Sequence, residues 1–438
     1  MMRIFLFFVF ITISSVLLAQ EGTYDNTFNN SGAGFDGEVK TVVVLSDGKM
    51  LVGGTFSTYN GSGCPANLVR LNSNGTIDNT FNNGGAGFNN SVNAIAVQSD
   101  DKIVVGGAFT TFNGSDCSDK IVRLSANGAL DNTFNNGGSG FDNLITAIVI
   151  QSNQKIVVGG WMNNYNGSPC ISYIQRLNSD GTIDAAFNNG GSGFNGVIYA
   201  LALQSDQKIL AGGGGTFNQY NGSPCNSYIA RLNTDGTNDG NFNNGGTGAD
   251  DEVYSMAVQS DGKILIGGFF LNYDGNPCPG SFARLNSNGT LDENFNFTSG
   301  NPNEGFDDLV YAIAVQSDGK ILVGGYFTTF NGSACSGGLI RVGSDGSSDN
   351  TFNNGGDGFN TPGQYILGLA LQSDGALLAC GSYNTYNGSS SIPVNMIRIN
   401  AASSAPAAIV PTLGEWGLIS LMIIAAAFGG LFVWKKFS

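Results

Sequence analysis

The sequence predicts an all-β fold, a seven-bladed β-propeller built from four-stranded antiparallel blades. The main observation is an Asp-x-x-Phe motif that recurs at spacings of 53 to 57 residues, with the same succession of apolar segments and tight turns in each interval. No helical pattern appears between the two chain ends. A repeat of this length forms one small sheet that cannot bury its own faces, so the copies must stack. The motif begins at Asp25, Asp78, Asp131, Asp184, Asp239, Asp292 and Asp349.

The second copy illustrates how each blade is expected to form. Its four expected strands are residues 92–98, 103–109, 120–124 and 131–134. The first is an apolar run that fits a strand buried on both faces, and a tight turn links it to the second. The pair Gly106-Gly107 lies inside the second strand, which suggests that a neighbouring sheet approaches closely, because glycine otherwise weakens a strand.

The chain ends predict how the ring closes. The seventh copy ends with a strand at 392–399 and has no Asp-x-x-Phe after it, whereas the chain begins with a spare motif at 25–28. We therefore predict that the N-terminal segment is the outer strand of the last blade. Without it the ring would have two free sheet edges, which invite pairing with other chains. The competing fold is an open solenoid, which should carry distinct capping repeats; none is visible in the sequence.

The two chain ends also indicate export. Residues 1–19 have a positively charged start, an apolar stretch and the small residue Ala19, as in a signal peptide. The apolar segment 417–434 would be about 27 Å long as a helix, enough to cross a membrane, with Lys435 and Lys436 on the cytoplasmic side. We thus expect one transmembrane helix. The expected domains are the signal peptide 1–19, the propeller 24–400, a linker 401–409 and a C-terminal segment 410–438.

A short motif stands immediately before this apolar segment. It consists of Val410, Pro411, Thr412, Leu413, Glu415, Trp416 and Gly417. Together with the apolar span and the basic tail, it resembles the IPTL-CTERM sorting signal of bacterial envelope proteins, with Val410 in place of the leading isoleucine. The resemblance implies recognition by an exosortase-like membrane peptidase and a location in the cell envelope or at the cell surface. An ordinary single-pass anchor is the alternative.

The repeats resemble the delta-60 family, β-propeller repeats of unknown function. The resemblance rests on motifs such as Ser-Asp-Gly-Lys-Ile-Leu and Arg-Leu-Asn-Ser-Asp-Gly-Thr-Ile-Asp, and it extends over residues 25–400. It implies the propeller fold and no particular activity.

The composition argues against several classes of function. The net charge of −15 makes nucleic acid an improbable partner. The chain has no histidine, so it lacks Ser-His-Asp and Cys-His catalytic groups and the usual zinc and iron ligand sets. No glycine-rich loop leads into a helix, which argues against a phosphate-binding loop. We expect no cofactor and no metal.

Two residue types that recur once per copy are expected to be structural. The arginine within the third expected strand should pair with a carboxylate, such as the aspartate of Asp-x-x-Phe, or stack on an aromatic ring. Six of the seven cysteines occupy one equivalent position per copy. Neighbouring positions should lie too far from each other for a disulfide, so we expect unpaired thiols.

Functional residues in a ring of similar copies are expected where the copies differ, because loops on a rigid scaffold commonly carry binding residues. Neutral drift is the competing explanation. Three places differ: Trp161, which is the only tryptophan of the propeller; the acidic connector with Asp250, Asp251 and Glu252; and the long connector with Asn301, Asn303 and Glu304.

We therefore expect an exported, envelope-anchored propeller that acts as a non-catalytic binding or surface-display module, with a glycan or a surface protein as candidate ligand. No catalytic residue is assigned. One alternative is a carbohydrate-active enzyme that uses two carboxylates about 5 to 9 Å apart, drawn from residues 250–252 and 307–308. The other is a purely structural coat component.

Overall fold

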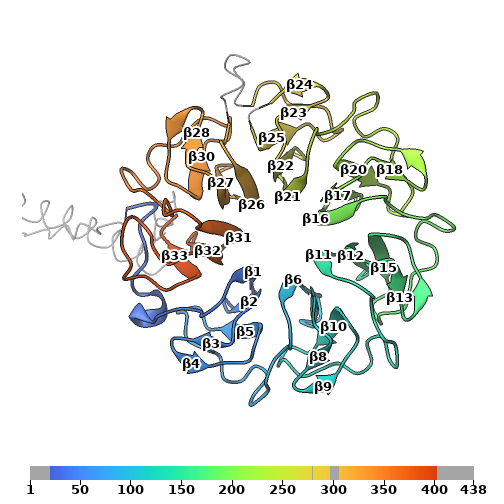
Figure 1. The fold of residues 1–438 in the computed structure, drawn as a ribbon, viewed down its shortest axis with the longest axis horizontal. Helices are drawn as coiled ribbons and strands as arrows, with labels where there is room; N and C mark the ends of the chain where they lie inside the picture. The colour runs from blue at the N-terminus through green and yellow to red at the C-terminus, as the bar shows by residue number, and fades with distance from the viewer. Residues whose placement is uncertain (1–19, 279, 296–304, 402–438) are drawn as a thin grey trace, which may run out of the picture. The chain divides into compact units, whose positions relative to one another are not determined.

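The protein forms a ring of small sheets around a common axis (Figure 1). The computed structural model describes residues 20–278, 280–295 and 305–401. These residues contain seven antiparallel sheets of three strands each, which we number as blades 1 to 7 in chain order. In every blade the first strand lies nearest the axis, the second is in the middle and the third is outermost (Figure 1).

The inner strands are β1 (Val39–Val44), β6 (Val92–Val97), β11 (Ile145–Ile150), β16 (Val197–Leu203), β21 (Val253–Val258), β26 (Leu309–Val315) and β31 (Tyr365–Leu371). The middle strands are β2 (Met50–Gly54), β7 (Ile103–Gly107), β12 (Ile156–Gly160), β17 (Ile209–Gly214), β22 (Ile264–Gly268), β27 (Ile321–Tyr326) and β32 (Leu377–Ser382). The outer strands are β5 (Leu68–Leu71), β10 (Ile121–Leu124), β15 (Ile174–Leu177), β20 (Ile229–Leu232), β25 (Phe282–Leu285), β30 (Leu339–Val342) and β33 (Met396–Ile399).

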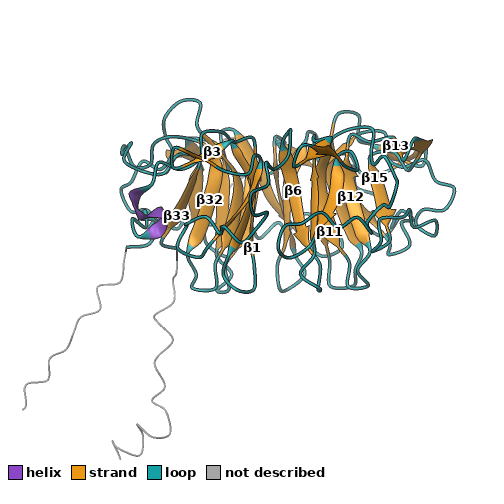
Figure 2. Cartoon of the chain, turned by 90° about the horizontal axis from the view of Figure 1, so that it is seen from below, coloured by secondary structure: helices purple, strands orange, loops and turns teal. Residues whose placement is uncertain are grey.

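Blades 1 to 6 each carry a two-stranded hairpin between the middle and outer strands. The hairpins are β3 (Thr58–Tyr59) with β4 (Ser62–Gly63), β8 (Thr111–Phe112) with β9 (Ser115–Asp116), β13 (Asn164–Tyr165) with β14 (Ser168–Pro169), β18 (Gln219–Tyr220) with β19 (Ser223–Pro224), β23 (Asn272–Tyr273) with β24 (Asn276–Pro277), and β28 (Thr329–Phe330) with β29 (Ser333–Ala334). They lie on one side of the ring, the upper side in Figure 2, where inner strands begin and middle strands end. We call this side the hairpin face and the opposite side the turn face.

The prediction of four-stranded blades is wrong, because the segment at Asp-x-x-Phe is a turn. In blade 2 the stretch between β10 and Asp131 makes one isolated bridge, between Leu124 and Leu130. The carboxylate of Asp131 then accepts hydrogen bonds from the backbone N–H (3.0 Å) and the hydroxyl (2.6 Å) of Thr133. The N–H of Phe134 donates to the carbonyl of Asp131 (3.1 Å). This local bonding competes with an extended conformation and bends the chain away from the sheet.

The structure contains no membrane-spanning helix in the residues that it describes. The helical element found in the described part of the chain is one short 3-10 turn, η1 (Phe28–Ser31). Nowhere in residues 20–278, 280–295 or 305–401 does a helix reach the length and apolarity that a membrane crossing requires. The predicted span 417–434 and the predicted signal peptide 1–19 lie outside the described residues.

The N-terminal segment lies beside the outer strand of blade 7 (blue beside red in Figure 1). Tyr24 forms an isolated antiparallel bridge with Ile399, so the expected outer strand is reduced to a single bridge. The N–H of Asp25 donates to the carbonyl of Arg398 (2.9 Å), and the carboxylate of Asp25 pairs with the guanidinium of Arg398 (2.6 Å). The segment therefore repeats the bridge that follows the outer strand in blades 1 to 6.

The same segment continues onto blade 1. Phe28 is buried in a cluster that combines Val39 and Val69 of blade 1 with Leu378 of blade 7. The N–H of Asn29 donates to the carbonyl of Asn74 (2.8 Å), which lies in the turn after β5. Between them these contacts join the first and last blades, and we call residues 20–35 the seal.

The hydrophobic core lies between adjacent blades. Leu51 and Leu68 of blade 1, for example, pack in one cluster with Val92 and Ile95 of blade 2. Phe88 lies in this cluster, 4.3 Å from the ring of Phe109 between centroids. The clusters explain why one blade cannot fold alone, because each buries its apolar faces only against its neighbours.

The paired glycines of the middle strands are required by two different contacts. A Cβ at Gly106 would lie 2.6 Å from Cγ2 of Ile145 in the next blade, which confirms the close approach of a neighbouring sheet. A Cβ at Gly107 would lie 2.1 Å from the carbonyl oxygen of Ser91, at the start of its own blade's inner strand. Backbone at that position cannot move aside without disturbing the sheet.

Replacing Gly107 by alanine is therefore expected to lower the free energy of unfolding by about 1–3 kcal/mol or more. Replacing Gly240 by alanine is the control, because a Cβ there meets no atom within 4 Å and the residue is not in the left-handed region. That change should be neutral or slightly stabilising. Guanidinium chloride denaturation measures both, and equal midpoints for the two variants would contradict this explanation of the glycine pair.

The cysteines of the described residues are free thiols, in line with the expectation of unpaired cysteines. Burial raises the pKa of the Cys64 thiol to about 11 and that of Cys117 to about 12. Cys380 of blade 7 stands where the other blades have the first glycine of the pair, and it is fully buried. Its partner on the inner strand is Gly368, where a Cβ would come within 2.7 Å of the Cys380 sulfur. The larger side chain at Cys380 is thus accommodated by the missing side chain at Gly368.

Candidate functional site

The repeated arginines and aspartates hold each blade together. In blade 5, Nε of Arg284 donates to Asp292 (2.8 Å), and Nζ of Lys263 donates to the same carboxylate oxygen (2.7 Å). The Arg284 guanidinium also lies 4.2 Å from the centroid of the Phe295 ring. Both expected contacts of the repeated arginine are thus confirmed. They use residues that recur in every blade, so they describe how the ring is built.

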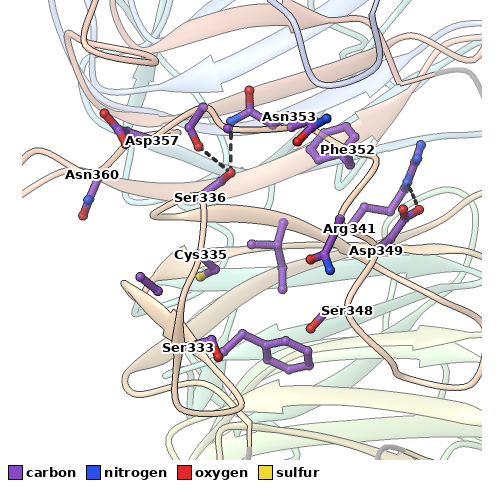
Figure 3. Close-up of a pocket in the computed structure, with 17 residues that line it drawn as sticks. Ser333, Cys335, Ser336, Arg341, Ser348, Asp349, Phe352, Asn353, Asp357 and Asn360 are labelled. Carbon is purple, nitrogen blue, oxygen red and sulfur yellow. Dashed lines mark hydrogen bonds and ion pairs between the residues drawn. The ribbon is translucent and has the colours of Figure 1, made fainter.

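Pockets on the outer part of the ring are lined by the same repeated residues. A cavity of about 450 Å³ in blade 6 is lined by Cys335, Arg341, Asp349 and Asn353, among others (Figure 3). Equivalent cavities lie in blade 2 (about 430 Å³) and blade 4 (about 230 Å³). In Figure 3 Arg341 is paired with Asp349, its Nε 2.8 Å from the carboxylate, and Nδ2 of Asn353 lies 3.0 Å from the hydroxyl of Ser336. The cavities are by-products of the repeat.

The predicted acidic connector proves to be mostly a repeated turn. The carboxylate of Asp250 accepts hydrogen bonds from the N–H groups of Leu271 and Asn272 (2.9 Å each), and so fixes hairpin β23–β24. Equivalent bonds are made by Asp36, Asn89, Asp142, Asn195 and Asp307. The carboxylate of Asp251 accepts from the N–H of Glu252 (2.8 Å), as Asp308 does from Leu309 (2.9 Å).

Asp307 and Asp308 also line a smaller cavity of about 240 Å³ on the hairpin face, between blades 6 and 7. Tyr326, Thr361 and Gln364 contribute to the same cavity. The four aspartates proposed for a hydrolase thus act as caps of turns. Within the described ranges no group of three or more His, Cys, Asp or Glu residues is arranged to hold a metal ion.

Trp161 follows the glycine pair of β12 on the hairpin face, and 43% of its surface is exposed. Phe269 of blade 5 and Tyr326 of blade 6 occupy the same slot after their glycine pairs, and they are 50% and 39% exposed. Sequence reasoning missed these two residues, although aligning the copies on the glycine pair would have found them. The structure therefore places three exposed aromatic side chains at one repeated position of one face.

Glu252 belongs to a second feature that the sequence analysis missed. Each inner strand has a β-bulge at its second or third residue, which adds one residue to the strand nearest the axis. In blades 4 to 6 that residue is Tyr199, Tyr254 and Tyr311. The ring centroids of Tyr199 and Tyr254 are 5.1 Å apart, and those of Tyr254 and Tyr311 are 5.4 Å apart.

The arc of rings continues to blade 7 and ends on blade 1. The Tyr365 ring lies 6.3 Å from that of Tyr311, and its hydroxyl donates to the carboxylate of Glu38 (2.7 Å). Lys40, the bulged residue of blade 1, lies 3.4 Å from the same carboxylate. At the other end the hydroxyl of Tyr254 donates to Glu252. The axial tyrosine cluster consists of Glu38, Lys40, Tyr199, Glu252, Tyr254, Tyr311 and Tyr365.

The bulged residues of blades 2 and 3 do something different. The side-chain amide of Asn93 donates to the carbonyl of Ile145 (3.1 Å), and the hydroxyl of Thr146 donates to the carbonyl of Ile198 (2.5 Å). Each bond links a blade to the next one. The bulged position thus carries a latch residue in blades 2 and 3, which hydrogen-bonds to the next blade, and a tyrosine of the arc in blades 4 to 6.

The tyrosines of the cluster stay protonated at neutral pH. Burial and the adjacent carboxylate of Glu252 raise the pKa of Tyr254 far above its ordinary value. Burial and Glu38 raise the pKa of Tyr365 to about 12. The phenols of Tyr254 and Tyr365 therefore donate hydrogen bonds to carboxylates, and the cluster offers aromatic faces and negative charge.

The predicted residues Asn301, Asn303 and Glu304 lie outside the described residues, as do the sorting-motif residues 410–417 and the tail residues Lys435 and Lys436. The structure therefore places only Trp161, Asp250, Asp251 and Glu252 of the predicted set. It brings Glu252 into the axial tyrosine cluster and leaves Trp161 farther out on the hairpin face, at the slot it shares with Phe269 and Tyr326.

Comparison with known structures agrees with the fold. The chain is similar to the WD40 beta-propeller domain of Doa1, with 15% identity over 87% of this chain and 95% of that one, at a TM-score of 0.50. It is also similar to a streptogramin B lyase (15% identity, 83% and 94% covered, TM-score 0.48) and to virginiamycin B lyase from Staphylococcus aureus (13%, 83% and 94%, 0.47). At these identities the likeness is one of fold alone. No relative is found among curated proteins.

Two family matches complete the comparison. Residues 410–432 match the IPTL-CTERM motif, which indicates an exported surface protein. Six stretches, which together exceed half of the chain, match the domain of unknown function (DUF5122) beta-propeller: 45–81, 98–134, 151–187, 204–242, 259–295 and 316–352. Each runs from the turn before a middle strand to the Asp-x-x-Phe motif. The chain therefore belongs to the DUF5122 beta-propeller family and carries an IPTL-CTERM motif at its C-terminus.

Proposed function

We propose that the protein is a surface-displayed binding module that holds a ligand on its hairpin face without transforming it. One observation carries this proposal: the copies share the contacts that build the ring, and they differ in aromatic residues on that face. Trp161, Phe269 and Tyr326 are exposed there, and the tyrosine arc replaces the latch residues of other blades. Exposed aromatic side chains contribute nothing to the core, whereas such residues commonly anchor ligands.

The side-chain chemistry supports binding over catalysis. The chain has no histidine, and burial holds the cysteine thiols in their protonated form by raising their pKa. The acidic residues Asp250 and Asp307 are used to fix hairpins. These groups are poorly placed to act as nucleophile or general base.

The sorting motif supports display at the surface. Val410 to Gly417 would be recognised by an exosortase-like membrane peptidase, which is the partner that the motif implies. The ligand would then be a glycan or a protein that reaches the cell from outside.

A ligand screen with the purified full chain tests the proposal. We expect hits on an array of glycans and peptides that weaken at least about tenfold when Trp161, Phe269 and Tyr326 are replaced together by alanine. Ile183→Ala is the control, because this residue is also exposed but lies after a turn on the turn face. An array without hits, or hits that the triple variant retains at full strength, would contradict the proposal.

A further inference from the structure

We infer that the axial tyrosine cluster is a receptor site for the guanidinium group of an arginine in a basic polypeptide. This inference rests on the proposed binding function and names the chemistry of the ligand. The site is formed by the arc of Tyr199, Tyr254, Tyr311 and Tyr365, with Glu252 at one end and Glu38 at the other.

The rings of the arc are tilted against each other and partly exposed, so a ligand can contact their faces. Successive ring centroids are 5.1, 5.4 and 6.3 Å apart, and the ring planes are tilted by 40° to 61°. All four tyrosines remain partly exposed. The β-bulges position Tyr199, Tyr254 and Tyr311. Hydrogen bonds to the two glutamates hold Tyr254 and Tyr365, which lowers the cost of ordering these rings for a ligand.

The charge around the arc is predominantly negative. The carboxylates of Glu252, Glu38 and Asp308 are close enough to raise the pKa of neighbouring tyrosines, Glu252 acting on Tyr199 and the other two on Tyr311, in addition to the effect of burial. Lys40 is the positive member of the cluster, and it is already paired with Glu38 (3.4 Å). With a net charge of −15 on the whole chain, the surroundings attract cations and repel anions.

Aromatic faces next to carboxylates are what a guanidinium group binds best. It stacks on aromatic rings, is weakly hydrated for a cation, and donates paired hydrogen bonds to carboxylates. The chain uses the same combination internally six times, where an arginine lies 4.2–5.1 Å from a phenylalanine centroid. Each of these arginines also pairs with an aspartate. A neutral glycan could stack on the rings but would gain little from the carboxylates.

The test is an isothermal calorimetric titration of the purified full chain with an acetylated, amidated tetra-arginine peptide. Tetra-citrulline, which has the same shape without the charge, is the ligand control and should not bind. Glu252→Gln removes the charge and keeps the size, and Tyr254→Leu removes the ring; each should weaken tetra-arginine binding by about tenfold. Tyr254→Phe keeps the ring and should bind within about threefold of the unmodified protein.

Asp261→Asn is the matched charge control, because Asp261 is an exposed carboxylate on a turn of the turn face. It should leave binding unchanged, and thermal unfolding will show that every variant is folded. Binding that is equal in the Glu252→Gln and Asp261→Asn variants would mean attraction by net charge alone and would overturn the inference. If tetra-arginine fails to bind while a glycan binds through the hairpin face, the inference falls and the binding function stands. If neither class binds, both fall.

Discussion

Replacing Asp292 by alanine is expected to lower the free energy of unfolding by about 3–5 kcal/mol. The carboxylate is 3% exposed and receives hydrogen bonds from both Arg284 (2.8 Å) and Lys263 (2.7 Å). Its removal leaves two cations without their partner, one of them buried. The arginine cannot escape to water easily, because it is also stacked on Phe295 and donates to the carbonyl of Ser344 (2.5 Å).

Equilibrium denaturation in guanidinium chloride, followed by circular dichroism, measures this loss. Asp116→Ala is the control, since Asp116 is exposed on hairpin β8–β9 and should contribute less than about 0.5 kcal/mol. A loss below about 1 kcal/mol for Asp292→Ala would show that the ion pairs do not hold the blade.

The same geometry predicts the acid sensitivity of the ring. Burial alone would raise the pKa of these aspartates, but hydrogen bonds from lysine, arginine and the following residues outweigh it, so the pKa of Asp78, Asp184 and Asp292 is lowered. A carboxyl group with a lowered pKa in the folded state stabilises the protein above its unfolded pKa, near about 4, and this stabilisation is lost as the pH falls further. The unfolding temperature should therefore drop below about pH 4, and less steeply in Asp292→Ala than in the unmodified protein.

Replacing Phe28 by alanine should also cost about 3–5 kcal/mol. Phe28 is 1% exposed and packs in the cluster that joins blade 7 to blade 1. Loss of the ring opens a cavity at the seam, where no covalent connection links the two blades. Phe269→Ala is the control, since Phe269 is half exposed on the hairpin face and its replacement should change stability by less than about 0.5 kcal/mol. Thermal unfolding midpoints that match for the two variants would mean that the seal contributes nothing to the ring.

The repeat made much of the fold predictable. Residues 92–98, 103–109 and 120–124 were expected as strands, and β6, β7 and β10 lie within those limits. The pattern wrongly predicted a fourth strand at residues 131–134. The segment is a turn, because Asp131 and Thr133 make local hydrogen bonds that compete with strand pairing. A two-residue strand such as β8 lies below the length at which apolar alternation can be recognised.

The candidate site was only partly predictable, for two physical reasons. The β-bulge shifts the alternation of the inner strand by one residue, so the sequence does not reveal that Tyr199, Tyr254 and Tyr311 share a direction. Asp250 looked exceptional because it begins a run of three acidic residues, although Asp36 and Asp142 make the same bonds in other blades. Trp161 was recognised because no other copy has a tryptophan.

Hydrogen exchange at the seal tests the central claim, that residues 20–35 join the last blade to the first and close the ring. The N–H of Asp25 donates to Arg398 (2.9 Å) as that of Asp78 donates to Arg70 (2.9 Å). The N–H of Asn29 likewise donates to Asn74 (2.8 Å). We predict that the amides of Asp25 and Asn29 exchange as slowly as that of Asp78, through opening of the whole ring. Exchange of Asp25 and Asn29 at the rate of an unstructured peptide, with Asp78 protected, would contradict a closed ring.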